Sequence, residues 1–99
     1  MAARERPDIW FVYIVRCNDG SLYTGITRDV AARIAAHESG RGARYTRGRG
    51  PLTLCAKRRC RSKGLALQLE HAIKRLPRVH KEQLTQPGKL ARLRLAKRA

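Results

Sequence analysis

One run of β-branched and aromatic residues constrains the fold of this chain more than any other feature. The run occupies residues 9–15 and reads IWFVYIV. A continuous apolar segment of this length is typical of a strand that is covered on both faces. A second strand is expected at residues 22–26, and the intervening Asn18, Asp19 and Gly20 tolerate positive φ angles. The pattern therefore predicts an antiparallel hairpin.

The length of the hairpin loop decides where two of the tyrosines point. With a two-residue loop, Tyr13 lies opposite Ile26 and the phenols of Tyr13 and Tyr23 are on opposite faces of the sheet. With a three-residue loop that has Gly20 in the left-handed conformation, Tyr13 lies opposite Gly25 and the two phenols share a face. Two phenols on one face can form a site, whereas phenols on opposite faces are ordinary strand residues. The hairpin alone is compatible with both arrangements.

An alanine-rich segment at residues 27–38 follows the hairpin and predicts a helix of about three turns. Thr27 or Asp29 can serve as its N-cap. Arg33 and His37 are four residues apart, so they lie side by side on this helix. A cation beside a titratable imidazole fits either a solvated basic face or a clamp for phosphate next to the tyrosines.

A third strand is expected at residues 52–56, and a strongly periodic helix at residues 62–76. The predicted packing stripe of this helix consists of Leu65, Leu69, Ala72 and Leu76. Glu70 is the only acid of the helix and flanks that stripe. Its carboxylate can pair with Lys74 one turn later. Alternatively, a lone carboxylate among cations suits a magnesium ion that also binds a substrate phosphate.

Two tripeptides, the first helix and the lone acid together resemble the GIY-YIG nuclease core. The tripeptides are residues 11–13 (FVY) and residues 23–25 (YTG). The resemblance also includes Arg33 and His37, the basic loop at residues 40–46, and Glu70. It extends over about residues 10–84, and the small bacterial proteins that consist of this domain alone are the most similar. The resemblance implies an α/β (α+β) fold in which helices flank a small, three-stranded, mostly antiparallel sheet.

The same resemblance implies a metal-dependent endonuclease that hydrolyses DNA phosphodiester bonds. The expected catalytic residues are Tyr13, Tyr23, Arg33, His37, Tyr45 and Glu70. Tyr23 is expected to act as the general base for an attacking water, and Glu70 to bind one Mg²⁺ or Mn²⁺ ion. A phenol with an ordinary pKa near ~10 is a poor base at neutral pH, so nearby cations must favour its ionised form. Arg33 and the metal would supply this charge, while His37 would orient the water or shuttle a proton.

Three positions depart from the family's pattern. Phe11 replaces the glycine of the first motif, and Thr24 replaces the central isoleucine of the second, although both substitutions suit a strand. Ile26 stands where several relatives carry a lysine immediately after the glycine of the second motif, here Gly25. One cation that could favour the phenolate of Tyr23 is therefore missing from its expected place. Gly25 itself is expected to have a structural role beside Tyr13.

The charge of the chain indicates a polyanionic partner. Lys and Arg total 23 against seven acids, which gives a net charge of +16. A charge this large destabilises a compact chain through self-repulsion, so nucleic acid is the leading candidate. The residues expected to bind it are Arg41, Arg44, Arg47, Arg49, Lys57, Arg58, Arg59, Arg61 and Lys63. DNA is the expected partner, and the alternatives are a non-catalytic nucleic-acid-binding module and an accessory of structured RNA or the ribosome.

The expected organisation is one nuclease-like domain at residues 9–86, between an N-terminal extension at residues 1–8 and a basic C-terminal helix or tail at residues 87–99. Residues 1–8 lack the apolar core of a signal peptide, and no stretch is long enough to span a membrane, so a cytoplasmic protein is expected. The cysteine spacing fits no standard zinc finger. A monomer is expected, with a dimer as the alternative. Without a second DNA-reading domain, binding should be structure-selective or weakly selective and linked to DNA repair or processing.

Overall fold

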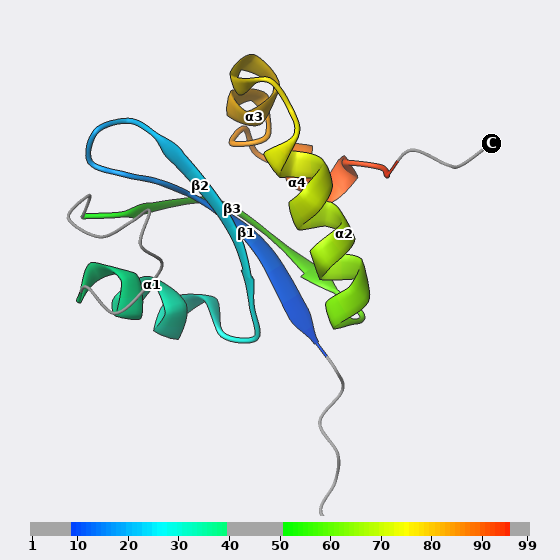
Figure 1. The fold of residues 1–99 in the computed structure, drawn as a ribbon, viewed down its shortest axis with the longest axis horizontal. Helices are drawn as coiled ribbons and strands as arrows, with labels where there is room; N and C mark the ends of the chain where they lie inside the picture. The colour runs from blue at the N-terminus through cyan, green and yellow to red at the C-terminus, as the bar shows by residue number, and fades with distance from the viewer. Residues whose placement is uncertain (1–8, 40–50, 96–99) are drawn as a thin grey trace, which may run out of the picture.

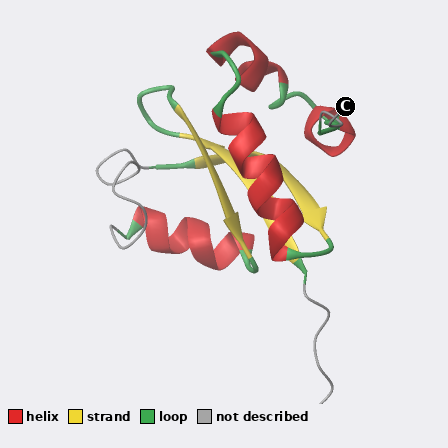
Figure 2. Cartoon of the chain, turned by 45° about the vertical axis from the view of Figure 1, so that its right-hand side comes forward, coloured by secondary structure: helices red, strands yellow, loops and turns green. Residues whose placement is uncertain are grey.

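A computed structural model describes residues 9–39 and 51–95 of the chain. The described elements are β1 (Trp10–Arg16), β2 (Leu22–Thr27), α1 (Val30–Glu38), β3 (Thr53–Cys60), α2 (Lys63–Lys74), α3 (Arg78–Gln83) and α4 (Lys89–Arg92). The strands form one sheet in the order β2-β1-β3, and both pairings are antiparallel. Figure 1 shows α1 and α2 on the two sides of this sheet, and the view in Figure 2 agrees. The predicted α/β (α+β) fold is therefore confirmed.

The hairpin has the three-residue loop. The amide of Cys17 donates to the Ser21 carbonyl at 2.8 Å, and the amide of Gly20 donates to the Cys17 carbonyl at 2.9 Å. Gly20 has a φ of 86°, a left-handed conformation that costs a glycine little. This turn sets Tyr13 opposite Gly25 in the register between β1 and β2. The phenols of Tyr13 and Tyr23 consequently share one face of the sheet.

Strand β3 is longer than the predicted segment 52–56. It runs from Thr53 to Cys60, so the basic run at residues 57–59 lies within the strand. Lysine and arginine are not typical strand residues, which is why the pattern did not extend this far. The central strand nevertheless continues to pair with β3 as far as Trp10 opposite Cys60, and tertiary pairing outweighs the local preference. A bulge near Ile14 and Val15 adjusts the register.

Two hydrophobic clusters cover the sheet, one on each face, because successive residues of β1 point to opposite sides. Val12 and Ile14 pack with α2 and with Leu84 and Leu90, whereas Tyr13 and Val15 pack on the side of α1. The buried stripe of α2 consists of Ala66, Leu69 and Ile73. The predicted stripe was therefore rotated: Leu69 is shared, while Leu65 and Leu76 are only partly buried at its margins. Leu90 belongs to the same core, so packing extends past residue 86 into α4.

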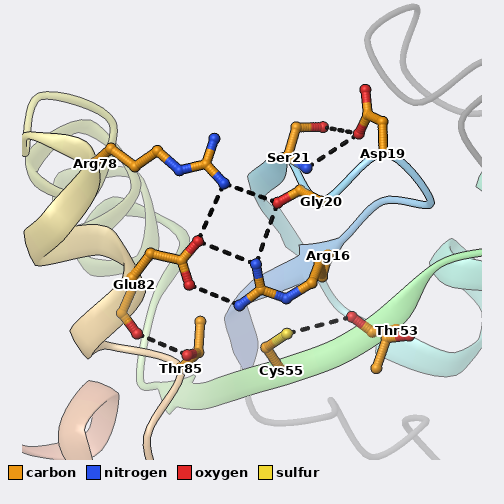
Figure 3. Close-up of polar contacts among 9 residues, drawn as sticks. All are labelled: Arg16, Asp19, Gly20, Ser21, Thr53, Cys55, Arg78, Glu82 and Thr85. Atoms are coloured by element: carbon orange, nitrogen blue, oxygen red, sulfur yellow. Dashed lines mark hydrogen bonds and ion pairs between the residues drawn. The ribbon is translucent and has the colours of Figure 1, made fainter.

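Helix α3 is tied to the hairpin by a charged network (Figure 3). The guanidinium of Arg16 donates to both carboxylate oxygens of Glu82, at 2.7 and 3.0 Å, and to the Gly20 carbonyl at 3.1 Å. Arg78 donates to the same carbonyl at 3.0 Å and to Glu82 at 3.2 Å. The hydrogen bonds from Arg16, with those from Arg78, lower the pKa of Glu82. The network fixes α3 against the turn of the hairpin that carries both tyrosines. No helix within the described residues is long and apolar enough to cross a membrane.

Candidate active site

Tyr13 lies at the centre of the candidate site and is fully buried, with 0% of its surface exposed. Its phenol occupies the space left by the missing side chain of Gly25. A Cβ atom at Gly25 would lie 2.7 Å from the Tyr13 hydroxyl oxygen and 3.1 Å from Cε2 of Tyr23. Real Cβ atoms essentially never come within 3.0 Å of another heavy atom. A side chain at this position would therefore displace one or both tyrosines.

His37 reaches the tyrosines from α1 and is also buried, with 2% of its surface exposed. Its Nε2 atom lies 3.0 Å from the Tyr13 hydroxyl oxygen. Its ring meets Tyr23 edge-on, with 5.3 Å between ring centroids. The helix that carries it begins at Asp29, whose carboxylate accepts a hydrogen bond from the Ala32 amide at 3.0 Å. Of the two predicted N-caps, the structure therefore selects Asp29.

The electrostatics of the site keep Tyr13 and His37 uncharged at neutral pH. Burial raises the pKa of Tyr13 to about 12, helped by the neighbouring Tyr23 and by the charge of Glu70, while Arg33 acts in the opposite direction. Burial, followed by the charge of Arg33, lowers the pKa of His37. Tyr13 therefore stays a phenol and His37 a neutral imidazole. Their hydrogen bond joins two neutral groups that can each donate or accept a proton.

Glu70 reaches this site from α2, which packs on the opposite face of the sheet. Because β2 is an edge strand, a side chain from α2 can approach Tyr23 around that edge. The Glu70 carboxylate is 19% exposed and lies 3.3 Å from Nζ of Lys74, the predicted ion pair. The same Lys74 ammonium lies 5.7 Å from the centre of the Tyr23 ring.

Lys74 also lies at the candidate site, although the sequence predicted it only as an ion-pair partner of Glu70. Ile26 replaces a lysine of the family's pattern. The structure places the Lys74 ammonium beside Tyr23, so a cation adjoins the phenol after all. The signal available in the sequence was its spacing of one helical turn from Glu70.

The residues present fit a hard divalent ion better than a zinc ion. The described residues contain no group of three or more His, Cys, Asp or Glu side chains that could hold a metal. Cys17 and Cys60 are buried in the clusters on opposite faces of the sheet. A single carboxylate such as Glu70 matches the way Mg²⁺ binds, with one or two protein oxygens, several waters and substrate phosphate.

The basic residues predicted to bind nucleic acid differ in where their side chains lie. Lys57 and Arg59 are exposed. In the register between β1 and β3 they stand opposite Tyr13 and Phe11, so they lie on the same face of the sheet as the tyrosines. Arg58 points to the other face, where its guanidinium donates to the carbonyls of Leu90 at 3.4 Å and Leu93 at 2.5 Å. That contact gives Arg58 a structural role at the end of α4. Arg61 and Lys63 are exposed near the start of α2. The remaining predicted residues, Arg41, Arg44, Tyr45, Arg47 and Arg49, lie outside the described residues.

Comparison with known proteins identifies the family of this chain. The GIY-YIG catalytic domain family matches residues 9–83. The chain is 50% identical over 82 residues to a UPF0213 protein of Cronobacter sakazakii, covering 83% of this chain and 85% of the relative. The solution NMR structure of the UPF0213 protein BH0048 from Bacillus halodurans is similar, with a TM-score of 0.53, 46% identity and coverage of 85% of this chain and 94% of that one. The solution NMR structure of the protein EF2693 from E. faecalis has a TM-score of 0.59 at 30% identity, covering 95% of this chain and all of that one (100%). The resemblance inferred from the sequence is confirmed: this chain belongs to the GIY-YIG family.

Proposed function

We propose that this protein is a metal-dependent endonuclease that hydrolyses phosphodiester bonds of DNA. The observation that carries the proposal is the convergence of four elements on one pair of tyrosines. Tyr13 comes from β1 and Tyr23 from β2, His37 contacts both from α1, and Glu70 approaches from α2. Arg33 on α1 is close enough to act on both Tyr13 and His37. A general base, cations and a carboxylate gathered in this way match the requirements of phosphodiester hydrolysis.

The two tyrosines have different roles in this proposal. Tyr13 is fully buried, and its pKa near 12 keeps it protonated, so it is unsuited to act as a base at neutral pH. Tyr23 is only partly buried and is the candidate general base that accepts a proton from the attacking water. Tyr13 would act through its hydrogen bond to His37, holding that imidazole beside Tyr23. We assign Tyr13 as a positioning residue on this basis.

Two cations support the charge that develops during the reaction. The Lys74 ammonium, 5.7 Å from the centre of the Tyr23 ring, would stabilise negative charge on a phosphate bound beside that ring. Arg33 would stabilise negative charge on the phosphate in the transition state. His37, neutral because its pKa is lowered, would take up the proton of the Tyr23 hydroxyl, so that Tyr23 can in turn accept a proton from the attacking water.

Glu70 would hold the divalent ion. When bound, such an ion neutralises charge on the scissile phosphate and on the leaving oxygen. The Lys74 ammonium contacts the same carboxylate. A divalent ion bound by Glu70 would therefore either share the carboxylate with this ammonium or displace the ammonium. Glu70 thus links the proposed metal site to the cation beside Tyr23.

The finer parts of the proposal concern the substrate and the setting. The net charge of +16 and the exposed Lys57, Arg59 and Arg61 suit a nucleic acid backbone. We propose DNA, recognised by its structure and not by a defined sequence, in repair or processing within the cytoplasm, by a monomer. Tyr45 and the arginines of residues 40–50 are proposed to complete the pocket and the binding surface.

The experiment that tests the proposal is cleavage of plasmid, single-stranded, flap and four-way DNA by purified protein, with Mg²⁺ or Mn²⁺ and with a chelator. The Glu70→Gln variant keeps the shape of the side chain and removes its charge. Asp19→Asn, in the exposed hairpin turn, removes the same charge away from the site and is the matched control. We expect metal-dependent cutting by wild type and Asp19→Asn and none by Glu70→Gln. Binding without cutting would indicate a non-catalytic module, and preference for structured RNA at fixed salt would indicate the accessory role.

A further inference from the structure

Trp10 lies at one end of the sheet and is flanked by two cations from different parts of the chain. Nζ of Lys63, at the start of α2, lies 5.2 Å from the centre of the indole. The guanidinium carbon of Arg28, in the turn after β2, lies 5.8 Å from it. Trp10 is only partly buried, although it packs against the core. A partly exposed indole with two cations over its ring combines the two groups that bind single-stranded nucleic acid, and a stacked base would displace a cation from the ring toward a phosphate.

Two hollows lie at this end of the sheet, and the indole lines one of them. The first, of about 490 Å³, is lined by Trp10, Arg28, Arg33 and Ala36 among others. Arg33, which acts on Tyr13 and His37, also lines this hollow, although Trp10 itself packs with the cluster on the other face of the sheet. Asp29 also lines it, but its carboxylate is engaged by the Ala32 amide at 3.0 Å.

The second hollow continues the basic surface on the side of β3. It has a volume of about 410 Å³ and is lined by Ile9, Arg59, Cys60 and Arg61. Cys60 is the register partner of Trp10, so the second hollow adjoins the same end of the sheet. Cations therefore lie near this end of the sheet on the sides of both β2 and β3.

We propose that Trp10 is a stacking platform for an unpaired nucleotide of the substrate, with Arg28 and Lys63 contacting the adjacent phosphates. This inference rests on the proposed function and narrows it to substrates that have a single-stranded segment next to the scissile phosphate. A base within a duplex is already stacked and paired, and its faces are not available to an indole. Duplex DNA would contact the cations through its phosphates alone.

The test uses the intrinsic fluorescence of the indole, because Trp10 is the single tryptophan of the chain. The protein is the Glu70→Gln variant in chelator, which prevents cutting. The probes are single-stranded DNA, single-stranded RNA and duplex DNA of the same sequence, each titrated at one salt concentration. We expect single strands to quench the fluorescence and duplex DNA to bind with little quenching. The two single-stranded arms show whether a deoxyribose or a ribose chain is preferred.

Variants supply the second measurement, the affinity of fluorescently labelled strands. In the Glu70→Gln background, Trp10→Leu should weaken binding of single strands by at least about fivefold, the lower limit for loss of one stacked base, and Trp10→Phe should largely restore it. Lys63→Ala should weaken binding more than Lys81→Ala, which removes the same charge on α3. Figure 1 places α3 at the opposite end of the molecule from the start of β1. Melting curves check that each variant is folded.

The outcomes separate this inference from the proposed function. Equal quenching by duplex and single strands, or unchanged affinity in Trp10→Leu, would overturn the inference even where the wild-type protein cuts DNA. Conversely, the wild-type protein could bind single strands through its indole and cut no substrate. That result would support the inference and refute the proposed nuclease activity. Loss of affinity in Trp10→Leu that Trp10→Phe does not restore, without quenching in the parent, would assign Trp10 to packing alone and overturn the inference.

Discussion

Gly25 lies opposite Tyr13 in the ladder between β1 and β2, and its replacement by alanine tests how tightly the candidate site is packed. The backbone of Gly25 does not need a glycine, because the positive-φ residues among those described are Gly20 and Gly88. The effect of Gly25→Ala is therefore steric. The new Cβ would meet the Tyr13 hydroxyl oxygen at 2.7 Å and Tyr13 Cζ at 2.9 Å, whereas ordinary contact begins at 3.4 Å.

The size of the effect follows from this geometry. The hydroxyl must move by about 0.7 Å, the difference between 2.7 and 3.4 Å, although Tyr13 is fully buried and bonded to His37. Overpacking of a core costs about 1–3 kcal/mol, and loss of the hydrogen bond to His37 adds about 1 kcal/mol. Reduced freedom of the unfolded chain offsets about 0.4–1 kcal/mol. A net destabilisation of about 2 kcal/mol should lower Tm by roughly 8–16 °C in a domain of this size.

The assay combines thermal unfolding, followed by circular dichroism, with the DNA cleavage rate measured well below Tm. Cleavage by Gly25→Ala should fall by about tenfold or more, because displacements approaching 1 Å in an active site cost on the order of 100-fold. Gly64→Ala is the matched control: its Cβ would have Ser62 Oγ as nearest neighbour at 3.8 Å, and in a helix the change should stabilise by about 0.5–1 kcal/mol. A Tm for Gly25→Ala at or above that of wild type would refute the packing described here.

Three further predictions concern charge. Lys74→Met keeps the aliphatic stem and removes the cation beside Tyr23, so cleavage should slow by about tenfold. Cleavage at the wild-type rate would argue against this role. Folding lowers the pKa of His37, so below about pH 6.5 the unfolded chain binds a proton that the folded chain does not. The free energy of unfolding should therefore decline as pH falls. His37→Gln should flatten that decline in denaturant titrations from about pH 7 to 5. Arg58→Ala should lower Tm without changing the salt dependence of DNA binding. Arg59→Ala should leave Tm unchanged and reduce by about 1 the slope of log affinity against log salt concentration. The reverse result would exchange the roles of the two arginines.

The hairpin shows what local sequence can and cannot predict. The turn residues and the apolar run of residues 9–15 predict two paired strands, but they are compatible with two registers. The choice between registers depends on packing over the whole sheet. In the observed register Tyr13 fits against Gly25, and both Tyr13 and Tyr23 join the cluster on the side of α1.

Strand β3 and the site residues missed by the sequence analysis have a common explanation. Residues 57–60 become a strand because β1 offers them hydrogen-bonding partners, a tertiary effect that outweighs their composition. Lys74 reaches Tyr23 because α2 packs against the sheet beside the edge strand β2. Arg58 donates to carbonyls at the end of α4 that are 32 and 35 residues away in the sequence. By contrast, helical spacing predicted that Arg33 and His37 lie side by side, and the scarcity of acids singled out Glu70, whereas only the resemblance to the GIY-YIG core linked these three residues to the tyrosines.

The central claim is that Tyr23, and not Tyr13, is the general base of a phosphodiesterase site. The most direct test is the single-turnover cleavage rate of Tyr23→Phe with saturating protein and Mg²⁺, measured on whichever DNA the wild-type protein cuts. We predict a loss of about 100-fold or more, the usual contribution of a general base, with unchanged affinity for DNA and unchanged Tm. Cleavage by Tyr23→Phe at the wild-type rate would contradict the account.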